Sequence, residues 1–204
     1  MKLLLATQNA HKIAEISELL RAISALEIVS LRDFPAVEMP DESGETMPEN
    51  ARLKAQSVMA QTGMISLADD SGIEVDCLNG EPGVRSARWK NGSDDDRMRA
   101  LLDKVDASST RKSRTARYRC AICVAFPDGT LLESQSVCEG RIALEARGIN
   151  GFGYDPIFEI SELTNAPIEY SNDTMAQIPS EIKAQISHRA RAVALMAKLL
   201  ISRH

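Results

Sequence analysis

Two adjacent carboxylates, Asp69 and Asp70, are the residues of this chain with the clearest capacity for chemistry. They follow an apolar run over residues 64–68, which is typical of a buried strand, and Ser71-Gly72 after them predicts that the strand is interrupted there. Burying a carboxylate is costly unless a cation neutralises it, so we expect a metal ion or a salt bridge at this point. Ligand sets made only of oxygen suit Mg²⁺, which commonly accompanies phosphate. The alternative is a pair of turn-capping aspartates, with Ser71 closing the turn.

A second candidate group lies in residues 7–12, between an expected strand over 2–6 and an expected helix over 11–23. Asn9 is placed to cap that helix, and backbone N–H groups at a helix N-terminus favour anions. Thr7 would add a hydroxyl and Lys12 a positive charge. The segment lacks the G-x-x-x-x-G-K pattern of a Walker A loop. It therefore indicates a different kind of anion-binding loop, although ordinary helices also begin in this way.

A third group opens the segment over residues 182–200, where apolar residues recur at spacings of three and four. Lys183, His188 and Arg189 lie at its beginning, along the edge of the apolar stripe. In that position they can face a ligand. The commoner alternative for Lys and Arg is the solvated face of an ordinary terminal helix.

Residues 151–158 place three aromatic side chains and two glycines in a chain that has only four Phe, three Tyr and one Trp. Gly151 and Gly153 allow positive φ and a close approach of the backbone to a ligand. Phe152 offers a face on which a flat base can stack, and Asp155 can accept hydrogen bonds from ring N–H groups. The alternative is a tight loop whose aromatic side chains fill the core.

Taken together, five segments resemble the non-canonical purine nucleoside triphosphate pyrophosphatase family, the inosine and xanthosine triphosphate pyrophosphatases. The segments read ATQNAHK (6–12), ADDSG (68–72), GEPGVRSAR (80–88), GFGYDPIF (151–158) and ISHR (186–189). They occur in the family's order and span nearly the whole chain. The resemblance implies Mg²⁺-dependent hydrolysis of ITP, dITP and XTP to the nucleoside monophosphate and pyrophosphate, which removes deaminated purines from the nucleotide pool. It also implies two lobes around a central cleft and a homodimer.

The resemblance assigns roles residue by residue. Asp70 matches the family's proton acceptor and a metal ligand, and Glu42 matches a further Mg²⁺ ligand. The positions that match substrate contacts are Thr7, Gln8, Asn9, Ala10, His11, Lys12, Ser71, Phe152, Gly153, Tyr154, Asp155, Lys183, His188 and Arg189. Residues 179–183 depart from the family's usual ending, and the five-residue spacing to His188 sets the register of Lys183.

The mechanism expected from these matches is metal-assisted hydrolysis without a covalent intermediate. Asp70 orients the attacking water or takes its proton, and Lys12, Lys183 and the loop N–H groups stabilise charge on the phosphates. The alternative from another class is a nucleotide-binding sensor that does not hydrolyse its ligand. Retention of Asp70 and Glu42 disfavours it, because a pure binder needs no water-activating carboxylate. A nearer alternative is a pyrophosphatase for pyrimidine or methylated nucleotides.

The same residues predict which base is accepted. Inosine and xanthosine present a 6-oxo acceptor and a protonated N1, whereas adenosine presents a 6-amino donor and a bare N1. A donor from Arg189 or His188, with Asp155 as the acceptor, would leave buried groups unpaired against adenosine. We therefore expect a preference for inosine and xanthosine triphosphates over ATP.

Composition limits the partners of the chain. An apolar content of 44% and a charged content of 26% are ordinary for a globular protein. The net charge of −5 disfavours a nucleic-acid-binding surface, and no apolar run has the length of a membrane span or the pattern of a signal peptide. We expect a cytoplasmic protein with a nucleotide substrate. The cysteines agree with a reducing compartment, since Cys120 and Cys123 lie three apart on an expected strand and point to opposite faces.

The order of elements predicts an α/β fold with a mixed twisted sheet and flanking helices, in a single domain over residues 1–204. Further strands are expected near residues 28–29, 64–68 and 73–77, with a hairpin over 117–126 and 130–138. Further helices are expected over 47–62 and from a Ser93 cap to about residue 105. The acid-rich stretch 35–46 is expected to be a mobile lip that carries Glu42, and residues 106–114 a surface loop.

Overall fold

The computed structural model describes residues 1–21, 23, 26–108, 113–161, 164 and 166–203. The chain forms two compact units, each assembled from segments that are distant in the sequence. The first unit comprises Met1–Ser71, Cys120–Ser136 and Arg189–His204, and the second comprises Gly72–Arg119 and Val137–His188. The boundaries between the units therefore fall inside the three longest strands and after the first residue of the C-terminal helix.

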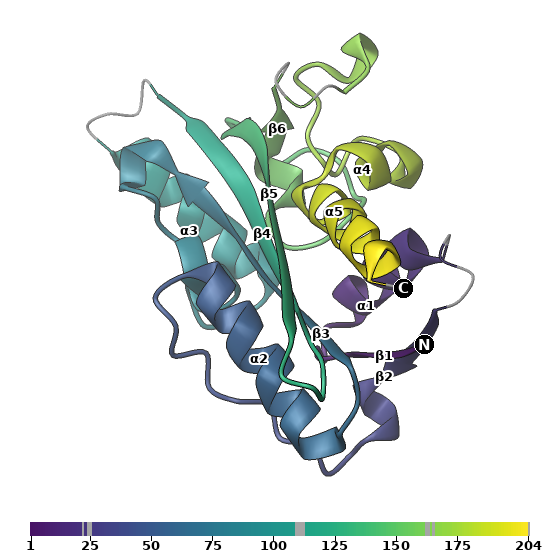
Figure 1. Cartoon of the computed structure of the whole chain (residues 1–204). Coiled ribbons are helices and arrows are strands. Elements are labelled where there is room, and N and C mark those ends of the chain that lie inside the picture. The colour runs from purple at the N-terminus through teal and green to yellow at the C-terminus, as the bar shows by residue number, and fades with distance from the viewer. Residues whose placement is uncertain (22, 24–25, 109–112, 162–163, 165, 204) are drawn as a thin grey trace. The chain divides into compact units, whose positions relative to one another are not determined.

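Six strands pair in one mixed sheet in the order β2-β1-β3-β4-β5-β6 (Figure 1). The strands are β1 (Lys2–Leu5), β2 (Glu27–Ser30), β3 (Ser66–Val75), β4 (Thr115–Ala125), β5 (Leu131–Ile142) and β6 (Phe158–Ile160). Strand β1 runs parallel to both β2 and β3, whereas β5 and β6 are antiparallel. The α/β class with a mixed sheet is thus confirmed.

Five helices accompany the sheet in the described part of the chain. They are α1 (Ala10–Leu20), α2 (Met47–Thr62), α3 (Asp94–Ala107), α4 (Ser180–Ile186) and α5 (His188–Ser202). Short 3₁₀ helices occur at Leu31–Asp33, Asp76–Leu78, Gly83–Arg88, Asp155–Ile157 and Ile168–Tyr170. None of the helices within the described ranges is long and apolar enough to cross a membrane.

The helix boundaries follow from local capping chemistry. The Asn9 side chain accepts hydrogen bonds from the backbone of α1, as the sequence predicted. At α2, Thr46 and Glu49 form a reciprocal capping box, and Gly63 ends the helix in the left-handed conformation with φ 66°. At α3, Ser93 forms the equivalent box with Asp96. These signals are local in sequence, which is why they were predictable.

The first unit has its own hydrophobic core. Strand β1 contributes Leu3 and Leu5, and the end of strand β4 contributes Val124. Helix α1 contributes Ile16 and helix α5 contributes Met196, and all five side chains are buried. The N-terminal strand, the first helix and the last helix are therefore held together by one apolar cluster. This packing fixes the positions of α1 and α5, from which several candidate residues project.

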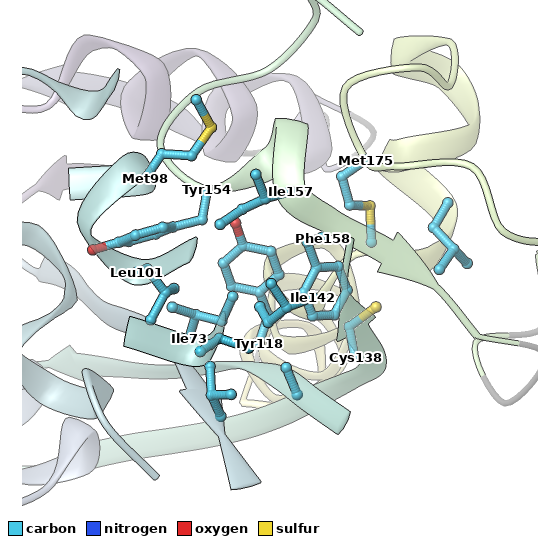
Figure 2. Packing of buried hydrophobic residues seen from close by; sticks show 14 of the residues in the cluster. Ile73, Met98, Leu101, Tyr118, Cys138, Ile142, Tyr154, Ile157, Phe158 and Met175 are labelled. Carbon is cyan, nitrogen blue, oxygen red and sulfur yellow. The ribbon is translucent and has the colours of Figure 1, made fainter. Parts of the chain in front are cut away.

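The second unit has a separate core, which Figure 2 shows in detail. Its centre is a set of rings and branched side chains around Tyr118, with Ile142 and Phe158 beside it. The rings of Tyr118 and Phe158 have centroids 4.5 Å apart and are tilted by 44°. Met98 and Leu101 of α3 close the cluster on another side. Helix α3 and strand β4 therefore share one core with Tyr154, Ile157 and Phe158 of the segment 151–158.

One sequence-based prediction about the carboxylates is wrong. The strands expected over 64–68 and 73–77 form the single strand β3, which runs through Asp69, Asp70, Ser71 and Gly72 without interruption. Both aspartates are buried and paired with cations, so the strand continues where polar residues normally end one. The alternative of a turn-capping pair is excluded for the same reason.

The C-terminal segment also differs from the expectation of one amphipathic run. Ser187 takes an extended conformation, with φ −65° and ψ 154°, and divides the segment into α4 and α5. Lys183, His188 and Arg189 are all buried, so the alternative of a solvated face is wrong for them. The break places Lys183 and His188 in the second unit and Arg189 in the first.

Other boundaries agree or differ slightly. The helix expected over 11–23 ends at Leu20, and residue 22 of that range lies outside the described residues. Strands β4 and β5 are neighbours in the sheet and are joined by the expected turn, in which Gly129 has φ 85°. Residues 109–112 of the expected loop lie outside the described part of the chain. All four cysteines are free thiols, and Cys120 and Cys123 are buried as expected.

Candidate active site

Asp69 and Asp70 lie in the middle of β3 and are only 1% and 5% exposed. Successive residues of a strand point to opposite faces, so the two carboxylates face different surroundings. Each is met by a lysine from a different helix, Lys12 from α1 and Lys54 from α2. The site therefore has an Asp69 side and an Asp70 side, both within the first unit.

On the Asp69 side, one carboxylate serves two cations. Asp69 Oδ2 lies 3.0 Å from Lys12 Nζ and 3.3 Å from Arg189 Nη2. Arg189 also donates to Ser71 Oγ at 2.8 Å and to Glu15 Oε2 at 2.6 Å. Burial raises the pKa of Asp69, but the nearby charges of Lys12 and Arg189 outweigh it and hold that pKa well below its usual value. Asp69 is therefore a permanent anion.

On the Asp70 side, Asp70 Oδ1 lies 2.9 Å from Lys54 Nζ, and Asn50 Nδ2 donates to Oδ2 at 3.4 Å. The Lys54 ammonium also lies 2.8 Å from Glu42 Oε1. Burial raises the pKa of Asp70, and the negative charge of Glu42 raises it further, against the lowering effect of Lys54. A raised pKa makes Asp70 a better proton acceptor than an ordinary aspartate.

The segment that carries Glu42 is tied to helix α2. Asn50 Oδ1 accepts from the backbone N–H of Gly44 at 2.8 Å, and a side chain at Gly44 would come within 2.6 Å of that oxygen. Glu49 Oε2 accepts from the backbone of Glu45 at 2.8 Å. These contacts place the expected lip against the start of α2 and keep Glu42 beside Lys54.

Sequence reasoning missed Lys54 and Asn50, and it gave Asp69 no role of its own. The spacing of Asn50 and Lys54 could have revealed them, because residues four apart lie on the same face of a helix. That face of α2 is buried and also carries Ala51, Ala55 and Val58. A lysine on an apolar helix face needs a buried anion. That requirement points to the adjacent carboxylates of β3.

Two carboxylates of the Asp70 side fit a divalent cation. Glu42 Oε1 and Asp70 Oδ1 lie 2.8 and 2.9 Å from one atom, Lys54 Nζ, so they converge on a single cationic position. Mg²⁺ takes one or two carboxylates and completes its shell with water and phosphate oxygens. In the described residues, no group of three or more His, Cys, Asp or Glu side chains is arranged to hold a metal. The donors thus fit an ion that is shared with a phosphate-bearing ligand.

The loop before α1 is internally hydrogen-bonded. Asn9 Oδ1 accepts from the backbone N–H groups of His11 and Lys12 at 2.9 and 3.2 Å, and Thr7 Oγ1 accepts from Asn9 N at 3.2 Å. The exposed residues of this loop are Gln8, Asn9, Ala10 and His11. An anion that used the helix N-terminus would replace the Asn9 side chain as the acceptor.

The second unit gathers the remaining candidates around Asp155, which is 3% exposed. Asp155 Oδ2 accepts from Lys183 Nζ at 2.7 Å and from the backbone N–H of Phe152 at 2.9 Å. Lys183 Nζ lies 5.0 Å from the centre of the Phe152 ring. A Cβ at Gly151 would fall 2.1 Å from Asp155 Oδ2, so only glycine allows this close wrap. Asp155 thus organises the loop that sequence analysis proposed for base binding.

Two further hydrogen bonds hold the loop over residues 151–158 in place. The Tyr154 hydroxyl donates to the carbonyl of Ser86 at 2.9 Å, and burial raises the pKa of Tyr154 to about 12. Gly153 N donates to Asp94 Oδ2 at 3.0 Å. Ser86 lies in the segment 80–88, which belongs to the family resemblance but to which sequence analysis assigned no role. The Ser86 hydroxyl accepts from Ile73 N at 2.9 Å, so it connects strand β3 to the residue that binds Tyr154.

The fold and the candidate site together define an α/β protein whose mixed sheet carries two buried carboxylates on strand β3, each paired with a lysine. Its sequence matches the model of the Ham1 family over residues 3–199. The chain belongs to the Ham1 family.

Curated relatives agree over almost the full length. The chain is 46% identical over 194 residues to a dITP/XTP pyrophosphatase of Symbiobacterium thermophilum, covering 95% of this chain and 91% of the relative. It is 44% identical over 197 residues to a dITP/XTP pyrophosphatase of Bacillus anthracis, covering 94% and 92%. The resemblance seen in the five sequence segments is thereby confirmed.

Solved structures support the fold. A HAM1 protein from Coxiella burnetii superimposes with a TM-score of 0.87 at 36% identity, covering 99% of both chains. A nucleoside-triphosphatase described as a dITP/XTP pyrophosphatase, from Mycobacterium abscessus, gives a TM-score of 0.75 at 37% identity, covering 96% of this chain and 98% of that chain. The arrangement of strands and helices is therefore that of Ham1 proteins.

Proposed function

We propose that this chain is a dITP/XTP pyrophosphatase, a hydrolase that cleaves the nucleotide to the nucleoside monophosphate and pyrophosphate. The observation that carries the proposal is the 46% identity to a dITP/XTP pyrophosphatase over 95% of the chain. The site agrees with it, because a buried carboxylate of raised pKa lies beside an ammonium group. A carboxylate in that state suits the activation of water next to an anionic substrate.

In this proposal Asp70 takes the proton of the attacking water or holds that water in line. Asp70 and Glu42 would hold Mg²⁺, which supplies charge neutralisation at the phosphate oxygens when bound. Lys54 holds the two carboxylates close together before the substrate arrives, and its charge lowers the pKa of Asp70 against the effect of burial. Its own pKa is raised because the charges of Asp70 and Asp69 outweigh the effect of burial.

The phosphates are assigned to the loop before α1. Lys12 lies 3.0 Å from Asp69, which holds the ammonium at the strand from which Asp70 projects. Thr7, Gln8, Asn9, Ala10 and His11 complete this loop, and Ser71 follows Asp70 on β3. Charge on the substrate would be met here by one ammonium and by N–H groups of the helix N-terminus.

The base is assigned to residues of the second unit. Phe152 offers the stacking face, Gly153 and Tyr154 complete the loop, and Asp155 and Lys183 fix its shape. Between the two donors considered for O6, His188 is the better assignment. The nitrogens of Arg189 already donate to Asp69, Glu15 and Ser71, which commits that guanidinium to the protein.

Other parts of the proposal follow from the family resemblance. The chain acts as one pyrophosphatase domain over residues 1–204, with the lobes and central cleft that the resemblance implies. The protein acts on the nucleotide pool of the cytoplasm as a homodimer, without nucleic-acid or membrane partners.

The decisive experiment measures product release from dITP, XTP, dATP and dGTP, with and without Mg²⁺. Pyrophosphate and orthophosphate are quantified separately, because a phosphatase acting on the terminal phosphate would release only orthophosphate. We expect Mg²⁺-dependent pyrophosphate release from dITP and XTP and little from dATP. Release from none of them would favour a nucleotide-binding sensor, and equal release from dATP would overturn the assignment of the base site.

A matched pair of lysine variants tests the phosphate loop. Lys12→Ala removes the ammonium paired with Asp69, whereas Lys2→Ala removes an exposed lysine paired with Glu27 in the same unit. We expect Lys12→Ala to weaken binding of the triphosphate more than binding of the nucleoside, since the charge acts on phosphate. Lys2→Ala should change neither. An equal loss for both ligands in Lys12→Ala would place Lys12 away from the phosphates.

A further inference from the structure

Tyr118 of strand β4 lies at the centre of the group of residues assigned to the base, yet no motif points to it. Its hydroxyl donates to Asp155 Oδ1 at 3.3 Å. Its ring lies parallel to the imidazole of His188, with centroids 4.5 Å apart and planes 10° apart. One buried side chain thus contacts both groups to which base recognition is assigned, the acceptor Asp155 and the donor His188.

The surroundings of Tyr118 leave its ring no freedom to move. The residue is 7% exposed, and Phe158 packs against the ring at 4.5 Å. Figure 2 shows the ring among Ile142, Ile157 and Phe158, in the centre of the second core. A ring held in a close-packed core keeps its position and orientation, and therefore limits the positions of the polar groups that contact it.

The hydrogen bonds of Asp155 divide its two oxygens between different tasks. Oδ2 is occupied by Lys183 and by the backbone of Phe152, at 2.7 and 2.9 Å. Oδ1 receives the Tyr118 hydroxyl, and a carboxylate oxygen has two lone pairs. The Tyr118 bond therefore adds a third contact that limits the rotation of the carboxylate, and acceptor capacity remains on Oδ1.

We propose that Tyr118 is the positioning residue for base discrimination: its hydroxyl orients Asp155 as an acceptor and its ring orients His188 as a donor. This inference rests on the proposed function. A protonated N1 and a 6-oxo group match a fixed acceptor and a fixed donor. A bare N1 and a 6-amino group present acceptor against acceptor and donor against donor, which leaves buried groups unpaired. Discrimination then depends on the orientation that Tyr118 imposes, because a carboxylate free to rotate could turn away from the mismatch.

Tyr118→Phe tests the hydroxyl while it keeps the ring. We expect the ratio of kcat/KM for dITP to that for dATP to fall at least about tenfold, the scale of one hydrogen bond at a site that reads polar groups. The fall should come both from weaker use of dITP, through a higher KM, and from better use of dATP, because the less constrained carboxylate can turn away from the mismatch. Tyr118→Leu also removes the stacking on His188 and should lower the ratio further.

A matched control separates positioning from a simple loss of stability. Ser134→Ala deletes another buried hydroxyl, which donates to the carbonyl of Ala192 at 2.9 Å in the first unit. Both variants should lose some thermal stability, but only Tyr118→Phe should change the substrate ratio. If Tyr118→Leu fails to fold, Tyr118→Phe still decides the question.

The outcomes distinguish this inference from the function on which it rests. Pyrophosphate release by Tyr118→Phe with an unchanged dITP to dATP ratio would overturn the positioning role and leave the pyrophosphatase activity standing. An equal change of the ratio in Ser134→Ala would also overturn it. Absence of pyrophosphate release from the unmodified protein would overturn the proposed function and this inference with it.

Discussion

Asp69 and Asp70 are neighbours in the chain and are similarly buried, yet their pKa values shift in opposite directions. Burial is the largest effect on both and raises both pKa values. At Asp69 the charges of Lys12 and Arg189 reverse that effect, whereas at Asp70 the effect of Lys54 is opposed by Glu42. The number and sign of neighbouring charges, rather than depth, decide the state of each carboxylate.

The difference assigns the two residues to different tasks. Two titratable groups with pKa values pushed apart indicate which one exchanges protons and which one stays charged. Asp69 is the fixed anion that holds Lys12 and Arg189 against β3. In the proposed function, Asp70 is the group that exchanges protons or binds a metal ion. One strand carries both tasks because its alternating side chains reach two helices on opposite faces.

The largest expected effect is the loss of stability in Asp69→Asn. The substitution leaves two buried cations without their shared anion, and breaking a buried pair in this way costs about 3–5 kcal/mol. The free energy of unfolding in urea measures this change. A loss as small as that of a surface substitution would mean that Glu15 alone satisfies Arg189, and the contrast with Asp70 would disappear.

Asp70→Asn should show the opposite pattern. We expect turnover to fall by at least ~100-fold, the scale of losing a positioned general base. Stability at neutral pH should fall less than in Asp69→Asn, because Lys54 keeps Glu42 as a partner and the charged form of Asp70 is disfavoured in the folded protein. Turnover and urea unfolding are measured on the same preparation. Near-normal turnover would move the catalytic role to another group, first of all Asp69.

The pH dependence of stability should separate the two residues by sign. The lowered pKa of Asp69 contributes stability that is present above its ordinary pKa and is lost as the pH falls. The raised pKa of Asp70 imposes a cost that is present at neutral pH and is relieved as the pH falls. The stability lost in Asp69→Asn relative to the unmodified protein should therefore stay constant from neutral pH down to about pH 4 and shrink only below it. Any stability gained in Asp70→Asn should instead shrink already between about pH 7 and pH 4, where the charged form of Asp70 is titrated away. Parallel curves for either variant would contradict its assignment.

The smallest expected effect is that of Ser71→Ala. Ser71 accepts from Arg189 at 2.8 Å and donates to Asp69 Oδ2 at 3.3 Å, so it belongs to the Asp69 side although it follows Asp70 in the chain. Removing this hydroxyl should cost about 1 kcal/mol of stability. The pH dependence of turnover should not change, because Asp70 keeps its own partners. A shift of the acidic limb of the pH–rate profile would show that the two sides are coupled.

Several features of the fold were predictable because their causes are local. The capping residues Asn9, Thr46 and Ser93 place helix starts, and the turn before residue 130 places a hairpin, without reference to distant contacts. The single strand β3 was not predictable in the same way. Two adjacent aspartates read as an interruption unless the cations on both faces are known, and those come from residues 12, 54 and 189.

The α/β class, the pyrophosphatase family resemblance and most residues of the candidate site could be predicted from residue types and their order along the chain. The partners of each charged group became known only from the folded chain. It commits Arg189 to Asp69 and Glu15, brings Lys54 between Glu42 and Asp70, and places Tyr118 against Asp155 and His188. The physical reason is that a pKa or a fixed hydrogen bond depends on distances of a few ångströms between groups far apart in sequence, which no spacing along the chain encodes.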